Sequence, residues 1–112
     1  MTHEMNLQDK YFDFILHGTK RIELRLNDEK RQKIKIGDTI IFRNEQGETF
    51  SAEVKDLFKY NSFEELFENF KIDILADKSM TKTELLQVLS EFYSAEKQKE
   101  FSVLGILVEI SQ

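Results

Sequence analysis

The feature that most constrains this chain is a strict alternation of charged and aliphatic residues that begins just after a glycine. Gly18 is followed by Thr19 and Lys20, and residues 21–26 then read Arg-Ile-Glu-Leu-Arg-Leu. Successive side chains of a β-strand point to opposite faces, so this run predicts a strand with one apolar and one charged face. Glycine takes positive φ without steric cost, so Gly18 predicts the end of a preceding helix. The charged face carries Arg21, Glu23 and Arg25. It is either a solvated surface or a functional site.

Further strands are predicted on both sides of a hairpin and at the end of the chain. Residues 39–43 are largely apolar, residues 44–47 read Asn-Glu-Gln-Gly as a hairpin turn does, and residues 50–55 alternate again. A short strand is expected around residues 5–7. Residues 103–110 are apolar on both faces, which predicts a central strand covered on both sides.

Helices are predicted from hydrophobic periodicity and from capping residues. Apolar side chains recur at helical spacing within residues 8–17, and residues 62–65 and 81–84 each form a capping box at the start of a helix. A short third helix of this group is expected over residues 94–100. Several aromatic side chains on these helices are expected to belong to the core: Phe63, Phe67, Phe70, Phe92 and Tyr93.

The composition indicates one small globular domain spanning residues 1–112. Hydrophobic residues make up 40% of the chain, ten phenylalanines supply core volume, and there is no cysteine for a disulfide or a thiolate metal site. We expect a cytoplasmic protein without a membrane segment, a metal or a cofactor. Strands at both ends with helices between them predict an α+β fold, in which the last strand pairs with an early one and closes a small, mostly antiparallel β-barrel with helices packed around it.

Charge is distributed unevenly along the chain. The total is −5, which argues against tight nonspecific binding to duplex DNA. Between residues 20 and 36, however, seven basic residues face three acidic ones, a local net charge of +4. Such a segment is either a solvated loop or a region that attracts an anionic ligand.

These motifs, taken in order, resemble those of the ASCH domain family, whose small barrels belong to the PUA-like superfamily. The resemblance implies a PUA-like barrel with a cleft beside the lysine motif, suited to RNA or to a nucleotide-like small molecule. The residues that carry it are Tyr11, Phe12 and Ile15, then the run from Gly18 to Arg25, then Asp28 and Arg31, and finally the run from Gly37 to Phe42.

The resemblance and the local charge together give a set of candidate ligand-binding residues. Lys20 follows a flexible turn and could reach a phosphate or a carbonyl group, while Glu23 could orient Arg25 or accept hydrogen bonds from the amino edge of a base. The alternative is an ordinary ion pair on an exposed strand face, worth under about 1 kcal/mol. The full set of candidates is Lys20, Arg21, Glu23, Arg25, Arg31 and Lys33.

Two further functions are compatible with the sequence. One branch of the family looks like a metal-independent amidohydrolase that removes the acetyl group of N4-acetylcytidine, using the lysine of this turn with a threonine and a distant glutamate. Lys20 matches that lysine, but Glu23 stands in place of the threonine, and the glutamate position falls near Asp77 or Lys78. In this alternative Lys20 would be the base or nucleophile and Glu23 the proton relay, although Glu23 stabilises the ammonium form. A protein-interaction adaptor without a cleft would instead present residues 21–26 as a flat, exposed surface.

Overall fold

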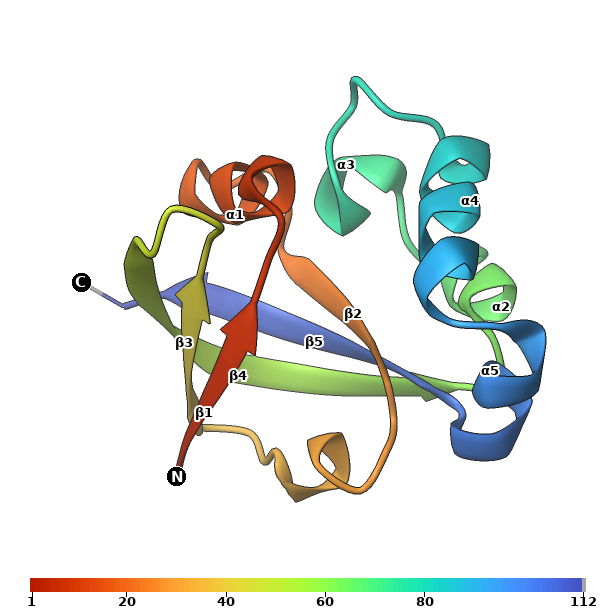
Figure 1. Ribbon diagram of the computed structural model, residues 1–112, viewed down its shortest axis with the longest axis horizontal. Coiled ribbons are helices and arrows are strands. Elements are labelled where there is room, and N and C mark those ends of the chain that lie inside the picture. The colour runs from red at the N-terminus through yellow and green to blue at the C-terminus, as the bar shows by residue number, and fades with distance from the viewer. Residues whose placement is uncertain (112) are drawn as a thin grey trace.

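One curled sheet organises residues 1–111, the part of the chain that the computed structural model describes (Figure 1). Its strands lie in the order β1-β3-β4-β5-β2. All neighbours are antiparallel except β1 and β3, which run parallel. The strands are β1 (Thr2–Asn6), β2 (Ile22–Leu26), β3 (Thr39–Arg43), β4 (Thr49–Tyr60) and β5 (Val103–Ile110).

The sheet is a half-barrel, and the closed barrel expected from the sequence is not formed. β5 pairs with both β4 and the early strand β2, as predicted for a central terminal strand. β1 and β2 are the two edges of the sheet, because β1 has β3 as its neighbour and β2 has β5. Across the open seam a side chain replaces strand pairing: Arg25 Nη2 donates a 2.8 Å hydrogen bond to the Asn6 carbonyl.

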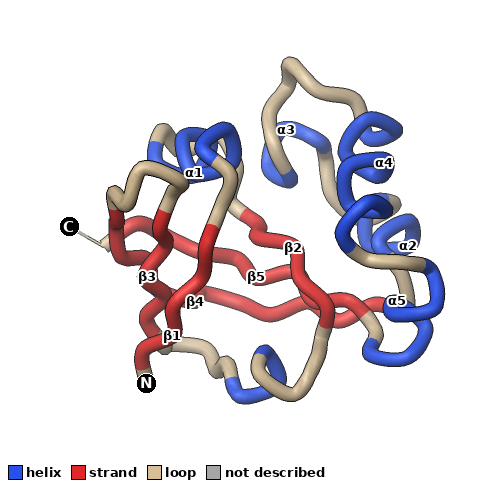
Figure 2. Tube along the Cα trace, viewed as in Figure 1, coloured by secondary structure: helices blue, strands red, loops and turns tan. Residues whose placement is uncertain are grey.

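The helices divide into two groups around this sheet (Figure 2). α1 (Asp9–Leu16) lies near the β1–β3 end and is followed by Gly18 at φ 83°, as predicted. The other four gather beyond β2, on the far side of the sheet from β1 (Figure 1). They are α2 (Phe63–Phe67), α3 (Ile72–Leu75), α4 (Lys82–Phe92) and α5 (Ala95–Phe101).

The capping residues behave largely as the sequence predicts. At α4 the Thr81 hydroxyl accepts from the Glu84 amide while the Glu84 carboxylate accepts from the Thr81 amide, which completes a capping box. At α2 only half of the predicted box is present, in which the Ser62 hydroxyl accepts from the Glu65 amide. α3 lies in a segment for which the sequence predicts only a connection, and a short 3-10 helix, η1 (Arg31–Lys33), follows β2.

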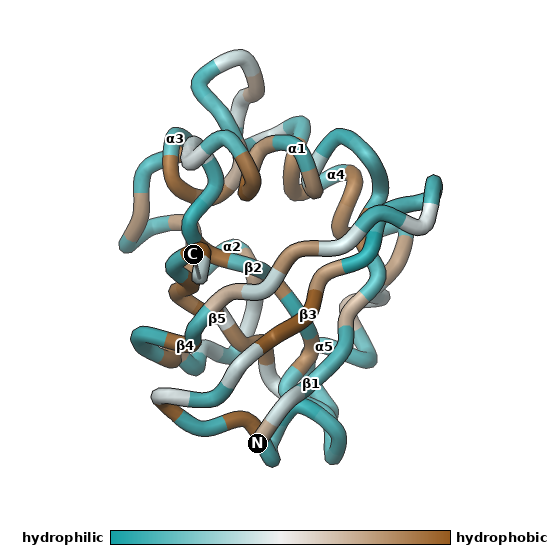
Figure 3. Tube along the Cα trace, turned by 90° about the vertical axis from the view of Figure 1, so that its left-hand side faces the viewer, coloured by the Kyte–Doolittle hydropathy of each residue, from teal (hydrophilic) through white to brown (hydrophobic). Residues whose placement is uncertain are grey.

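Two apolar clusters fill the molecule, one on each side of the sheet. The first lies inside the half-barrel and includes Phe12 of α1 and Phe42 of β3. The second joins β2 to the helices beyond it and includes Ile22 and Leu66. Figure 3 shows the corresponding pattern, with hydrophobic colour along β3 and hydrophilic colour on the surrounding loops. One face of β2 is therefore covered by these helices.

One member of the predicted aromatic core is in fact exposed. Phe63 and Phe67 are buried as expected, whereas Phe92 is 60% exposed at the last position of α4. Its side chain lines a pocket at the helix surface. Helical spacing identifies the apolar side of a helix, but it does not show where that side leaves the core.

Two further local features concern β5 and β1. Gly105 marks a close approach of chains, since an added Cβ would lie 3.1 Å from both Ile22 Cγ2 and Leu66 Cδ1, while the register shift of the sheet lies on β4. His3 is ordered within β1, and its Nε2 atom lies 2.8 Å from Asp38 Oδ2. Within residues 1–111, no helix has the length and apolar character needed to cross a membrane.

Candidate functional site

A pocket opens along the edge strand β2, between α1 and α4. It offers 160 Å³ to water, and we call it the β2 pocket. Its floor carries the charged side chains of Lys20, Glu23 and Arg25. Its two walls are Tyr11 of α1 and the apolar residues of α4, and its rim includes Asn6 and Gln8. The α4 wall consists of Leu85, Val88, Leu89 and Phe92, with Tyr93 just beyond the helix.

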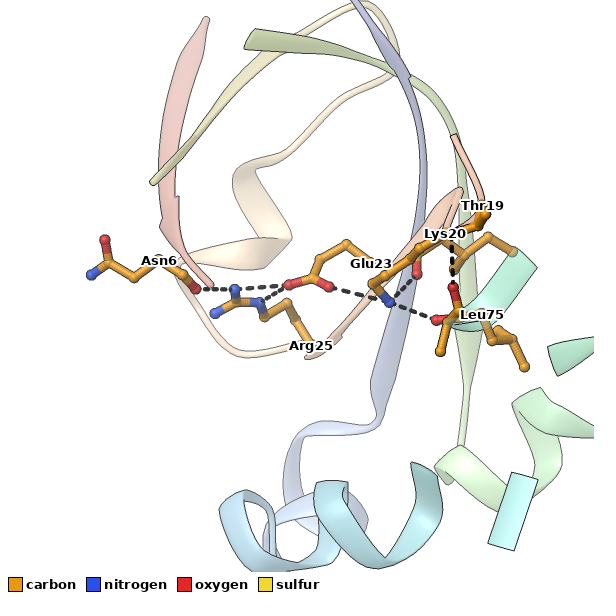
Figure 4. A network of polar contacts seen from close by, with 8 residues as sticks. Asn6, Thr19, Lys20, Glu23, Arg25 and Leu75 are labelled. Atoms are coloured by element: carbon orange, nitrogen blue, oxygen red, sulfur yellow. Dashed lines mark hydrogen bonds and ion pairs between the residues drawn. The ribbon is translucent and has the colours of Figure 1, made fainter. Parts of the chain in front are cut away.

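Glu23 is the centre of the floor and is only 4% exposed. Its Oε2 atom accepts 2.8 Å contacts from both Nε and Nη2 of Arg25, while Oε1 lies 3.5 Å from Lys20 Nζ (Figure 4). The strand alternation brings Glu23 and Arg25 to one face two residues apart. A carboxylate thus lies between two cations, which is the arrangement that a buried charge requires.

Lys20 is held by the protein itself rather than extended toward solvent. The side chain is 3% exposed, and Nζ donates to the Ile22 carbonyl at 2.6 Å and to the Leu75 carbonyl at 2.7 Å. With Glu23 nearby, all three ammonium protons have an oxygen to face. Burial lowers the pKa of Lys20, and the charge of Glu23 opposes that decrease.

Residues 19–21 contact α3 through consecutive hydrogen bonds. Besides the Lys20 contact to Leu75, the Arg21 amide donates to the Ile74 carbonyl at 2.7 Å, and the Thr19 hydroxyl lies 3.5 Å from the Ala76 carbonyl. Three neighbouring residues therefore meet three neighbouring carbonyl groups. This ladder fixes α3 against the start of β2 and holds Lys20 in place.

The charge state of the floor follows from these neighbours. Burial alone would raise the pKa of Glu23, but Arg25 and Lys20 lower it overall. For Arg25, burial works against the charged form, whereas Glu23 and the nearby Tyr93 raise its pKa overall. The neighbours of Glu23 thus favour its charged form, and Glu23 in turn favours the charged forms of Lys20 and Arg25.

Tyr11 adds an aromatic wall with a polar group. Burial, followed by the charge of Glu23, raises the pKa of Tyr11, so its hydroxyl stays protonated. The centre of its ring lies 5.9 Å from Lys20 Nζ. The hydroxyl group is therefore available to donate or accept a hydrogen bond near the carboxylate.

The structure brings together only part of the predicted set of site residues. Lys20, Glu23 and Arg25 converge in the β2 pocket. Arg21 does not share their face: it precedes β2, is exposed, and lines a separate hollow with Lys55 and Glu109. Its backbone amide donates to the Ile74 carbonyl of α3, and its carbonyl accepts from the Val108 amide of β5.

The other two candidates, Arg31 and Lys33, lie in η1. They line a different depression that includes Lys30 and Phe101, and Arg31 Nη1 is 3.2 Å from Asp28 Oδ2. Neither contributes to the β2 pocket.

The remaining alternatives can be compared with the same geometry. Asp77 and Lys78 do not line the β2 pocket, and the Asp77 carboxylate accepts from the Ser79 amide instead. The buried Glu23 contradicts a flat, exposed adaptor surface. Within the described residues, no three His, Asp or Glu side chains gather as metal ligands do.

Sequence reasoning misses the walls of the pocket. It places Tyr11 in a helix motif and Phe92 in the core, and it identifies Val88 and Leu89 only as part of an apolar helix face. One signal is present in the sequence: both Tyr11 and Phe92 are large aromatics at the border of an amphipathic stripe, where an aromatic side chain can be part core and part surface.

Comparisons with known proteins agree with this fold. The chain is 39% identical to the hypothetical protein PH0355, covering 99% of this chain and 100% of that one, with a TM-score of 0.89. It is 36% identical to protein PF0455 from Pyrococcus furiosus, covering 100% and 99%, with a TM-score of 0.78. An ASCH domain from Lactobacillus crispatus JV V101 has the same fold at 16% identity, covering 97% and 79%, with a TM-score of 0.72.

No curated protein sequence matches the chain significantly. The sequence profile of the ASCH domain, however, matches residues 5–110, nearly the whole chain. Both the motifs and the half-barrel thus lead to one assignment, and the chain belongs to the ASCH domain family.

Proposed function

We propose that this domain binds a single nucleotide, free or as part of an RNA strand, in the β2 pocket. The observation that carries the proposal is the convergence of three charged side chains, the buried Lys20 and Glu23 and the half-buried Arg25, at the floor of an apolar-walled pocket. Removing charges from water is costly, and strongly perturbed ionisable groups in a cleft are a mark of functional sites. PUA-like membership is consistent with RNA binding as well.

The dimensions of the pocket support a small, flat ligand. Pockets for drug-sized molecules enclose roughly 300–1,000 Å³, whereas the β2 pocket offers 160 Å³. This space suits one ring with its substituents rather than a helix or several bases. Aromatic walls and a polar floor match the way proteins bind unstacked bases of single-stranded RNA.

A binding titration tests the proposal directly. The four nucleoside 5′-monophosphates and single-stranded RNA octamers are titrated into isotope-labelled protein, and amide chemical shifts are followed by NMR at two salt concentrations. We expect shifts at residues around the β2 pocket and an affinity that falls at least tenfold in Arg25→Gln, since Arg25 supplies the donors of the floor.

Arg43→Gln provides the matched control, because Arg43 is an exposed arginine on β3 outside the pocket. Its affinity should equal that of the unmodified protein. If neither nucleotides nor RNA shift the signals of pocket residues, the proposal is wrong.

A second function, deacetylation of an acylated nucleoside, is favoured by one observation: burial lowers the pKa of Lys20, as a lysine base or nucleophile requires. Two carbonyl contacts and Glu23 oppose it, because they stabilise the ammonium form. We therefore expect no release of cytidine from N4-acetylcytidine when the mixture is followed by chromatography. Release that exceeds the level in Lys20→Met would favour the enzyme.

A further inference from the structure

We infer that the β2 pocket takes a base edge-first, with the ring between Tyr11 and Phe92 and its hydrogen-bonding edge against Glu23 and Arg25. The inference rests on the proposed function and names its ligand class: an uncharged heterocycle that presents an N–H donor beside an acceptor. Ligands whose N–H is blocked by alkylation are excluded by the same arrangement.

The walls favour a flat ring. Phe92 is a large aromatic side chain that is 60% exposed, yet it lines the pocket from the last position of α4. Its ring centre lies 6.4 Å from that of Tyr93. Tyr11 faces the pocket from α1, on the opposite wall. Base–aromatic stacking between such walls tolerates any base, because every base has a π-face.

The floor supplies one acceptor beside several donors. Glu23 Oε2 accepts from Arg25, whereas Oε1 faces Lys20 Nζ at the longer distance of 3.5 Å. A carboxylate has about four acceptor positions, so Oε1 can accept an N–H from a ligand. Arg25 has five N–H donors, and its Nε and Nη2 atoms serve Glu23 and the Asn6 carbonyl. Its remaining donors can meet a ring nitrogen or carbonyl oxygen.

The same contacts argue against an anionic group at the floor. Lys20 is the cation nearest the α3 side, and its protons already face two carbonyls and a carboxylate. A phosphate placed there would meet Glu23 before it met an unengaged cation. The sugar and phosphate therefore lie at the rim, near Asn6 and Gln8, and the base lies inside.

Matched nucleoside pairs test the inference by NMR titration. The pairs are uridine with 3-methyluridine, inosine with 1-methylinosine, cytidine with N4,N4-dimethylcytidine, and adenosine with N6,N6-dimethyladenosine. For the nucleoside that binds best, we expect the methylated partner to bind at least tenfold more weakly, since it has no donor for Glu23. An RNA octamer containing the same base, tested in parallel, distinguishes a polymer ligand from a free nucleoside.

The possible outcomes separate the inference from the proposed function. If both members of a pair shift the pocket signals with equal affinity, edge reading is wrong while nucleotide binding in the pocket stands. If nucleosides, nucleotides and octamers all leave those signals unchanged, the proposed function fails and the inference fails with it.

Variants of the exposed wall give a second test that does not depend on the buried charges. Phe92→Ala should weaken binding at least fivefold because the stacking surface is removed, and Phe92→Tyr should retain it. Ile36→Ala is the control, because Ile36 is also an exposed apolar residue, at 64%, but lies away from the pocket. Equal affinity of Phe92→Ala and the unmodified protein would remove Phe92 from the binding surface.

Discussion

Lys20 shows how a residue that the sequence places in a binding site can serve mainly to build it. The sequence predicts a lysine that reaches toward a ligand, and the structure places that ammonium against two backbone carbonyls and Glu23. It lines the pocket while holding α3 and orienting the carboxylate. We therefore regard Lys20 as a positioning residue of the proposed site.

This role makes a prediction for stability. Lys20→Met keeps the aliphatic stem but removes the charge, which leaves the Ile22 and Leu75 carbonyls without their donor and Glu23 with Arg25 alone. Breaking a buried ion pair costs roughly 3–5 kcal/mol, and because Arg25 remains we expect a decrease in the free energy of unfolding of about 3 kcal/mol. Urea unfolding at neutral pH measures it.

Lys59→Met is the matched control for this measurement. Lys59 is an exposed lysine on β4, so its substitution should change the free energy of unfolding by less than about 0.5 kcal/mol. Equal effects of the two substitutions would show that Lys20 contributes no more than a surface lysine.

At the scale of single elements, Asp38 fastens β1 to the sheet. Its carboxylate lies 2.8 Å from His3 Nε2, 3.2 Å from the Met1 amino group and 3.0 Å from the Lys35 amide. These contacts, led by the His3 hydrogen bond, lower the pKa of Asp38 from its ordinary 3.8 to about 2. β1 is an edge strand, so this cluster supplements its pairing with β3.

The direction of the pKa shift gives a pH dependence. A carboxylate with a lowered pKa in the folded state contributes stability that is complete above its ordinary pKa and is lost as pH falls from about 3.8 to about 2. Asp38→Asn should therefore be less stable than the unmodified protein at pH 7, and the difference should shrink over this range. Thermal unfolding from pH 7 to pH 2 checks it, with Asp13→Asn on the exposed side of α1 as the control.

The shape of the β2 pocket depends on α4, because this helix supplies one entire wall. Thr81→Ala removes one half of the capping box and should cost about 1 kcal/mol of stability. Because fraying begins at the first turn, where Leu85 meets the pocket, nucleotide affinity should also fall slightly. Thr83→Ala, an exposed threonine inside the helix, is the control in both the unfolding and the binding measurement.

The sequence predicts most of the individual strands and helices, but it does not predict that the sheet stays open as a half-barrel. Alternation and capping residues located β2, β4 and α4, because these patterns are local. The open seam between β1 and β2 was not predictable, since it depends on which strands become edges. The convergence of Glu23 and Arg25 followed from strand geometry. The same alternation did not show that Arg21 lies outside the pocket, with its amide bonded to α3 more than 50 residues away.

At the scale of the whole molecule, only part of the basic segment reaches the β2 pocket, which Lys20 and Arg25 line. The basic segment predicted from the sequence includes Arg31 and Lys33 of η1, and these residues lie outside the β2 pocket. A free nucleoside would not reach both regions. A single-stranded RNA could occupy the pocket with one base and extend its phosphates toward η1.

Salt dependence separates these contributions. For the double variant Arg31→Gln with Lys33→Gln, we expect unchanged nucleoside affinity and weaker RNA octamer binding. The slope of log affinity against log salt should become shallower by about 0.7 for each phosphate that the variant no longer neutralises. Fluorescence anisotropy of labelled octamers measures this, with Lys59→Gln and Lys71→Gln as the control pair. An unchanged slope would show that η1 does not bind the RNA.

The strand order has a consequence for how the domain is made. β1, β3 and β4 pair with one another within the first 60 residues, but β2 has β5 as its sheet neighbour, and β5 is Val103–Ile110. During synthesis β2 therefore emerges early, but it can pair only after β5 has been made. Likewise, Lys20 can donate its hydrogen bond to the Leu75 carbonyl only after α3 has been made. The residues that line the β2 pocket lie between Asn6 and Tyr93, but β2 gains its sheet neighbour only from β5, so a chain interrupted before residue 103 would leave this strand unpaired beside the pocket.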